Sequence, residues 1–122
     1  MVNTESSVAR LSQAIRIRTV SYENADDIDA EQFSPFHRFL EDAYPTVHRI
    51  LERVVVNDLS LLYTWQVADP DLAPILLMGH QDVVPVDSET EDKWNHGAFS
   101  GEIADRFVWG RGAWTKRVRL SP

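Results

Sequence analysis

The sequence predicts an α/β fold in which two or three helices are followed by buried strands and a hairpin. Three observations predict it: an early region with apolar residues at the helical period, a central segment that alternates apolar and polar residues, and a later run that is apolar throughout. The chain has 122 residues and is 43% hydrophobic, so it is long enough and apolar enough to bury the core that such layers need.

The first half of the chain predicts helices. An amphipathic helix is expected over Thr4–Arg16, because apolar residues recur on one face behind candidate N-caps. The polar and acidic residues 21–31 predict a loop. A longer helical pattern covers residues 36–54, and Pro45 inside it predicts a kink, or a break at which Pro45 opens a second helix.

The second half predicts strands. Residues 60–67 alternate apolar and polar side chains, which is typical of a strand, and residues 69–71 predict a turn. The continuous apolar run Ile75–Met78 is typical of a strand buried on both faces. Residues 99–109 predict a hairpin that turns near Ala104 and Asp105.

Composition narrows the function classes. The net charge is -7, with 19 acidic against 12 basic residues, so nucleic acid is not an expected partner, because phosphate binding needs a basic surface. The chain has no cysteine, so a metal must be held by histidines and carboxylates. No signal peptide and no membrane-spanning apolar stretch is visible, so we expect no membrane partner and a cytoplasmic location by default.

His80 and Asp82 are the residues whose positions in the sequence best suit metal binding or catalysis. His80 follows the predicted buried strand directly, at the edge where α/β sheets bind ligands, and a neutral imidazole there can bind Zn²⁺. Asp82 could fix the tautomer of that imidazole. Taken alone, a His-x-Asp pair is a weak signal, and a histidine capping a strand end beside an aspartate in a turn is the more common explanation. His37, His48 and His96 are interpreted as surface or packing residues.

A longer motif changes this interpretation. Residues 76–86, Leu-Leu-Met-Gly-His-Gln-Asp-Val-Val-Pro-Val, resemble the first metal-site motif of the aminoacylase/carboxypeptidase S family of di-zinc peptidases, whose relatives include acetylornithine deacetylase and succinyl-diaminopimelate desuccinylase. Further matches occur in the family's order from about Ser7 to Ala113: Phe36–Glu41, Tyr44–His48, Ser60–Trp65, Lys93-Trp94, Phe99–Ile103 and Gly110–Ala113.

The resemblance implies a fold, a cofactor and an activity. It implies an α/β catalytic domain with two zinc ions, in which His80 is a metal ligand and Asp82 is the catalytic-site residue that orients it. A zinc-bound water, activated by a glutamate, would attack the amide carbonyl of a small peptide or an N-acyl amino acid.

The match breaks after Ala113. Where the family has an aspartate that bridges both zinc ions, this sequence has Thr115, and a hydroxyl group cannot replace that carboxylate. A reading-frame shift explains the change: if the family-like Leu-Asp-Lys-Lys-Gly-Ser is encoded as CTG GAC AAA AAG GGT TCG, loss of the first base gives Trp-Thr-Lys-Arg-Val-Arg, which is the sequence of residues 114–119. Reading through an unspliced intron is the rival explanation.

The sequence therefore predicts two regions: residues 1–113 as the N-terminal portion of a peptidase catalytic domain, and residues 114–122 as an aberrant tail. We expect this chain to bind zinc weakly at most and to lack hydrolase activity, because the other ligands are expected downstream. The apolar run of residues 75–78 is then an aggregation hazard. Two alternatives are a non-catalytic fragment that acts as an interaction module or has no function, and an unrelated α/β binding domain with a chance His-x-Asp pair.

Overall fold

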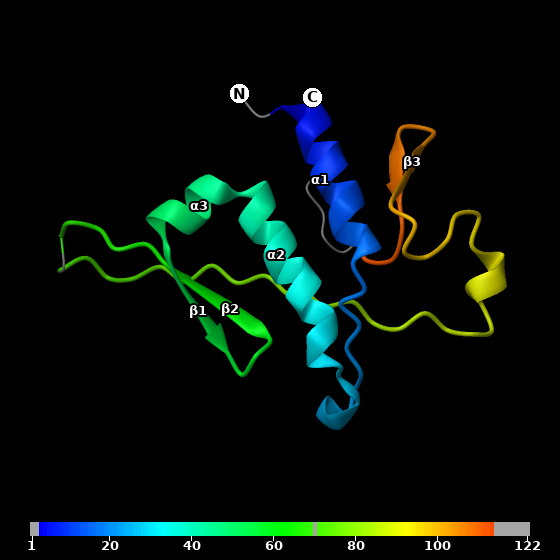
Figure 1. The fold of residues 1–122 in the computed structure, drawn as a ribbon, viewed down its shortest axis with the longest axis horizontal. Helices are drawn as coiled ribbons and strands as arrows, with labels where there is room; N and C mark the ends of the chain where they lie inside the picture. Colours follow the sequence, from blue (N-terminus) through cyan, green and yellow to red (C-terminus); the bar gives the residue numbers. More distant parts are fainter. Residues whose placement is uncertain (1–2, 70, 114–122) are drawn as a thin grey trace.

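The structure, a computed structural model, describes residues 3–69 and 71–113. It combines helices with two separate antiparallel hairpins (Figure 1). The helices are α1 (Thr4–Arg16), α2 (Ser34–Ala43) and α3 (Pro45–Ile50), and the strands are β1 (Glu52–Val56), β2 (Ser60–Thr64), β3 (Glu102–Ala104) and β4 (Phe107–Trp109). Three short 3-10 turns complete the list: η1 (Ala25–Asp27), η2 (Ala30–Phe33) and η3 (Glu91–Lys93). The mixed content agrees with the α/β class, whereas the assignment to a zinc-peptidase domain stays a prediction.

Helix α1 has the bounds that the sequence predicts. The Asn3 side chain accepts a hydrogen bond of 3.2 Å from the backbone N–H of Ser6, which caps the first turn. At the other end, Ile17 adopts an extended conformation and the helix stops. Ser12 and Ile15 form its buried face, and this face packs against strand β4.

Pro45 separates α2 from α3, as the sequence predicts. Tyr44 leaves the helical conformation, and Pro45 begins the new helix at a position where its missing N–H costs nothing. The prediction that the helical pattern reaches residue 54 is wrong, because α3 ends at Ile50 and Val54 lies in β1. The β-branched residues Val54, Val55 and Val56 favour the strand once β2 lies alongside to pair with it.

Strand β2 confirms the alternation read from the sequence, although it ends at Thr64 and not at residue 67. Val54 of β1 pairs with Leu62 of β2 in the antiparallel register. Asn57 and Asp58 make the turn with φ values of 49° and 59°, a left-handed conformation that these residue types tolerate. Figure 1 shows this hairpin beside α2 and α3.

The second hairpin also forms where the sequence predicts a turn. Ala104 pairs with Phe107, and Asp105 and Arg106 between them have φ values of 52° and 67°. Two consecutive positive φ values are typical of the tight turn whose twist matches that of the flanking strands. Its strands are short, beginning at Glu102.

The buried strand expected at Ile75–Met78 is absent from the described residues, so that prediction is wrong for this structure. The four side chains of this run are 88%, 71%, 89% and 87% exposed. Apolar composition alone does not make a strand: the backbone needs a neighbouring strand to pair with, and no described segment pairs with these residues. At the turn expected at residues 69–71, the backbone N–H of Asp71 donates to the Asp69 carboxylate at 3.0 Å, a local hydrogen bond that is typical of a turn, while Pro70 itself lies outside the described residues. The aberrant tail, residues 114–122, also lies outside the described residues.

The core is small. Its buried apolar side chains are those of Ile15, Phe33, Phe36, Val83 and Ala98, which come from α1, the η2–α2 segment and two later loops.

Within residues 3–69 and 71–113, no helix combines the length and the apolar content needed to cross a bilayer. The cytoplasmic location stays a prediction from the sequence.

Two glycines allow α1 to approach the later loops closely. A Cβ atom at Gly110 (φ 152°) would collide with the side chain of Ile15, and one at Gly101 (φ 57°) would collide with the backbone oxygen of Ser12. Arg16 adds a hydrogen bond of 2.9 Å from its Nε to the carbonyl oxygen of Ser100. The packing of α1 on this region therefore requires bare backbone at both positions.

We predict that Gly110→Ala destabilises the chain by about 1–3 kcal/mol, because the added methyl group overpacks the Ile15 contact and the φ angle disfavours a side chain. Denaturant unfolding measures the change. Gly97→Ala is the matched control, since the atom nearest to a Cβ added at Gly97 is the Ser100 Cβ, 3.8 Å away. Equal stability of the two variants would contradict the packing described here.

Candidate functional site

The segment that carries His80 and Asp82 is held against the chain that leaves α1. Val20 and Val83 form a parallel β-bridge. The backbone N–H of Val83 donates to the Thr19 carbonyl oxygen at 2.8 Å, and the N–H of Ser21 donates to the Val83 carbonyl oxygen at 3.0 Å. The two segments are far apart in sequence, so this bridge is what brings Ser21 close to Asp82.

Side chains reinforce the bridge on both sides. The hydroxyl of Thr19, whose residue is only 1% exposed, donates to the carbonyl oxygen of Gln81 at 2.7 Å. The Gln81 side-chain amide donates to the carbonyl oxygen of Leu59, in the turn of the first hairpin. The residue between His80 and Asp82 is thus fixed through its backbone and through its side chain.

Arg111 holds the other end of the motif. Its guanidinium group donates to the carbonyl oxygens of Val84 at 3.2 Å and Pro85 at 3.0 Å. Its backbone N–H donates to the Ala98 carbonyl oxygen. The structure therefore brings together two stretches that the sequence analysis treated as separate matches, residues 76–86 and residues 110–113.

His80 lies with the Nδ1 edge of its ring toward Asp82. Its Nδ1 is 2.9 Å from the backbone oxygen of Asp82 and 3.4 Å from the carboxylate Oδ1. A carbonyl oxygen only accepts, so Nδ1 carries the proton in this hydrogen bond and the lone pair of the neutral ring is on Nε2. The His80 side chain is 59% exposed. The arrangement leaves Nε2 available as a ligand atom on an accessible side chain.

Ser21 is a functional candidate that the sequence analysis missed. Its hydroxyl donates to Asp82 Oδ2 at 2.5 Å. This hydrogen bond lowers the pKa of the Asp82 carboxyl below its ordinary value; partial burial opposes the shift, and the nearby His80 adds a smaller lowering. No local pattern could reveal the contact, because it joins residues that are 61 positions apart.

An apolar cavity of about 570 Å³ lies beside the motif. Its walls come from the η2–α2 segment, the first hairpin and the extended segment before His80, and they include Phe33, Phe36, Leu61 and Leu77. His80 and Asp82 lie on the polar side of the same cavity. The two candidate site residues therefore lie at the wall of an apolar cavity.

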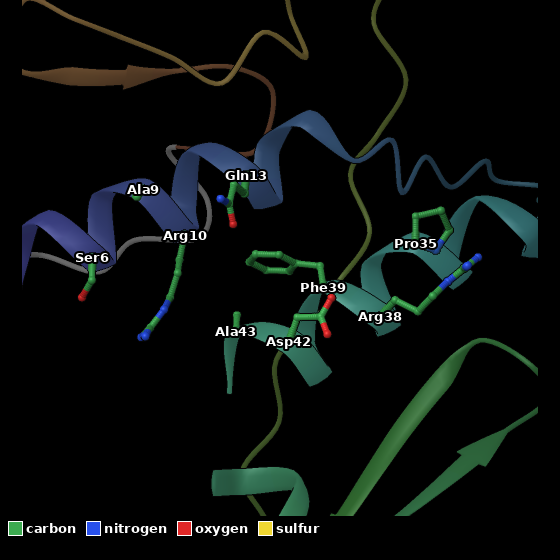
Figure 2. Close-up of a pocket in the computed structure, with 9 residues that line it drawn as sticks. All are labelled: Ser6, Ala9, Arg10, Gln13, Pro35, Arg38, Phe39, Asp42 and Ala43. Atoms are coloured by element: carbon green, nitrogen blue, oxygen red, sulfur yellow. The ribbon is translucent and has the colours of Figure 1, made fainter. Parts of the chain in front are cut away.

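A second groove, of about 810 Å³, lies between α1 and α2 and shares no residue with that cavity. Figure 2 shows the Phe39 ring between the two helices, with Arg10 and Arg38 at the sides. The Arg10 guanidinium also lies over the Tyr44 ring, 5.0 Å from its centre. The groove carries neither His80 nor Asp82.

The donor set does not make a complete zinc site. Among residues 3–69 and 71–113, no group of three or more His, Cys, Asp or Glu side chains is placed to hold a metal ion. Zinc sites use three or four protein ligands, and the motif offers one imidazole with a carboxylate behind it. The other histidines have local partners: His37 the Leu59 carbonyl oxygen, His48 the Tyr63 hydroxyl, and His96 the Glu102 carboxylate.

The known proteins to which this chain is similar are named as carboxypeptidases or as an N-fatty-acyl-amino acid synthase/hydrolase. The chain is 47% identical over 115 residues to carboxypeptidase S of Saccharomyces cerevisiae, 43% identical over 105 residues to a probable carboxypeptidase S-like protein of Dictyostelium discoideum, and 37% identical over 105 residues to an N-fatty-acyl-amino acid synthase/hydrolase of Mus musculus. These alignments cover 84–88% of this chain but about 20% of each relative, so the chain spans about one fifth of their length. No family model and no solved structure matches.

We predict that Ser21→Ala raises the pKa of Asp82 toward its ordinary value, because the largest stabiliser of the carboxylate is removed. With a lowered folded-state pKa, Asp82 contributes stability that is fully present above the ordinary pKa and is lost as the pH falls through the folded-state value. Ser21→Ala should therefore flatten the loss of unfolding free energy on acidification.

The pKa is measured from the carboxyl carbon shift of Asp82 by NMR. Ser21→Thr keeps the hydroxyl and should keep the low pKa, and Ser88→Ala, in an exposed loop, controls for loss of a serine elsewhere. An unchanged Asp82 pKa in Ser21→Ala would show that the hydroxyl does not bind the carboxylate in solution.

Proposed function

We propose that this chain, which is similar to carboxypeptidase S and its relatives over the matched residues, is part of a metal-dependent peptidase or amidohydrolase of that family. The observation that carries the proposal is the 47% identity to carboxypeptidase S over 88% of this chain, a span that includes His80. The intact hydrolase, and not the described residues alone, is the unit to which the activity is assigned.

The names of the relatives suggest the bond that is cleaved. A carboxypeptidase releases a C-terminal amino acid, and an N-fatty-acyl-amino acid hydrolase releases an amino acid from an acyl group. Both reactions break an amide bond whose nitrogen belongs to an amino acid with a free carboxylate. We therefore assign small peptides or N-acyl amino acids as the substrate class of the complete enzyme.

His80 and Asp82 are the residues proposed to serve the metal site. The Nδ1–H bond to Asp82 leaves Nε2 as the metal-binding atom of His80. Asp82, held by Ser21, fixes the ring orientation and keeps a negative charge behind it. When bound by the complete ligand set, zinc would polarise the amide carbonyl.

The division of the chain follows from this function. We propose that residues 1–113 are a portion of the catalytic domain and that residues 114–122 arise from a shifted or unspliced reading frame. Thr115 stands where the family-like sequence would place a bridging aspartate. The proposal accounts for a match that spans one fifth of each relative.

A chimera tests the function directly. We predict that carboxypeptidase S of Saccharomyces cerevisiae remains an active hydrolase when its aligned segment is replaced by residues 7–113 of this chain. Within the chimera, His80→Ala should abolish turnover, and Asp82→Asn should lower kcat by about 10–100-fold, as loss of a group behind a metal ligand does. Asp92→Asn is the matched control and should be neutral. A chimera that folds and hydrolyses equally well with His80→Ala would refute the assignment.

The isolated 122-residue chain should show no hydrolysis of N-acyl amino acids with or without added Zn²⁺, because one imidazole cannot hold the ion in a catalytic geometry. Isothermal titration should detect only weak zinc binding, at millimolar rather than nanomolar concentration. Zinc-dependent turnover by the pure chain, abolished by a chelator, would contradict this expectation.

A further inference from the structure

Two side chains from distant parts of the chain donate to the same backbone oxygen, that of Leu59. His37 on α2 places its Nε2 3.1 Å from this oxygen, and the Gln81 side-chain amide is the second donor. A carbonyl oxygen has two lone pairs, so it can accept both hydrogen bonds at once. Helix α2, the turn of the first hairpin and the segment that carries His80 and Asp82 are therefore joined at one atom.

The contact with Leu59 determines what the His37 ring does. Because a carbonyl oxygen can only accept, Nε2 of His37 carries the hydrogen in this bond, and the lone pair of the neutral ring is on Nδ1. Protonation of the ring would add a hydrogen at Nδ1 and leave the Nε2–H donor in place. His37 is thus a donor in either charge state, and a glutamine side chain, whose amide nitrogen lies at a similar distance from the backbone, can replace that donor.

The Leu59 carbonyl group is itself held by the turn. Asn57 and Asp58 adopt positive φ values, and the N–H of Leu59 donates to the Val56 carbonyl oxygen at 3.3 Å. His37 is half-buried, so water competes less for its ring nitrogen than it would at a fully exposed position. The bond from His37 therefore fixes the turn relative to α2.

Gln81 links the turn to the candidate site. Its side chain binds the Leu59 oxygen, and its own carbonyl oxygen accepts from the buried Thr19 hydroxyl at 2.7 Å. His80 precedes Gln81 and Asp82 follows it, and Nδ1 of the His80 ring is 2.9 Å from the Asp82 backbone oxygen. A shift of Gln81 would change the backbone between these two residues, and with it the direction of the His80 Nε2.

Packing alone does not account for the His37 contact. A ring that only fills apolar space can leave its nitrogen atoms to water, whereas this nitrogen meets an oxygen that the motif also binds. His48 gives the contrast, because its ring nitrogens contact the Tyr44 carbonyl oxygen and the Tyr63 hydroxyl. The shared acceptor is thus the observation that connects His37 with His80.

We propose that His37 is a positioning residue of the candidate metal site, which acts through the Leu59 carbonyl oxygen and Gln81 on the orientation of the His80 ring. The inference rests on the proposed function, because it concerns the direction of a proposed metal-binding atom. The role needs no contact between His37 and the metal or the substrate. Loss of the His37 donor frees the turn to move relative to α2, so the His80 ring would be held less firmly beside Asp82.

The first measurement uses the full 122-residue chain and needs no hydrolysis. The nitrogen-15 shifts of the His80 ring, at a pH where the ring is neutral, show which nitrogen carries the hydrogen. We expect the Nδ1–H form in the unchanged chain, a mixture of both forms in His37→Leu, and recovery of the Nδ1–H form in His37→Gln. His48→Leu, which removes a ring from α3, is the matched control and should keep the Nδ1–H form.

The second measurement uses the chimera with carboxypeptidase S described above. His37→Leu should lower kcat about tenfold and leave KM unchanged, because a misdirected metal ligand impairs the chemical step and not the binding of substrate. Gln81→Met removes the other donor to Leu59 and should act in the same way. Since both residues act through one oxygen, the double variant should lose less activity than the product of the two single losses. His37→Gln should restore kcat.

The inference is overturned if His37→Leu leaves the His80 tautomer unchanged, or if it leaves kcat unchanged in an active chimera. It is also overturned if His37→Leu and Gln81→Met act independently, or if His37→Leu lowers only the unfolding midpoint, as a purely structural role would. An active chimera with unchanged kcat in His37→Leu would leave the proposed function standing. A chimera without activity that depends on His80 would instead remove the proposed function, and the tautomer measurement would then decide on His37 alone.

Discussion

The parallel bridge between Val20 and Val83 is the contact on which the geometry of the candidate site depends. It closes a long loop that contains α2, α3 and the first hairpin, and its hydrogen bonds contribute only about 1 kcal/mol each. Thr19 strengthens it from a position that is almost fully buried. Without this bridge, Ser21 would not lie within hydrogen-bonding distance of Asp82. The Asp82 carboxylate would then lose the hydrogen bond that holds it beside the His80 ring.

Further contacts hold the motif in place in a structure with so small a core. Leu59 binds Gln81 from the first hairpin, and Arg111 binds the Val84 and Pro85 carbonyl oxygens from the far end. These contacts come from three separate parts of the chain and converge on one segment. The result is a presented imidazole whose tautomer is set by its own neighbour, Asp82. That is a useful component of a metal site, although the described residues do not complete one.

Local signals made much of the fold predictable. The bounds of α1, the new helix at Pro45 and the turn at Asp105 follow from residues that act on their immediate neighbours. Features that depend on distant partners were not predictable in the same way. Val54 fitted a helical period but lies in a strand because β2 pairs with it, and the Ser21 hydroxyl reaches Asp82 across a large sequence separation.

The run at residues 75–78 shows the same limit from the other side. Its composition correctly describes a segment suited to burial on both faces, yet burial needs covering layers, and no described segment supplies them. His80 and Asp82 were named from a motif, and their roles stay a proposal. Their mutual placement, with the ring nitrogen held by the aspartate, is what the motif alone could not reveal.

We propose that this polypeptide is one piece of a longer carboxypeptidase S-type hydrolase, and the decisive experiment is to sequence the transcript and genomic DNA around and beyond the Ala113 codon. We predict that a shifted or spliced frame continues with family-like sequence, including an aspartate where Thr115 now stands. DNA with no family-like sequence in any frame beyond that codon would contradict it, and residues 7–113 would then have to be understood as a short protein in their own right.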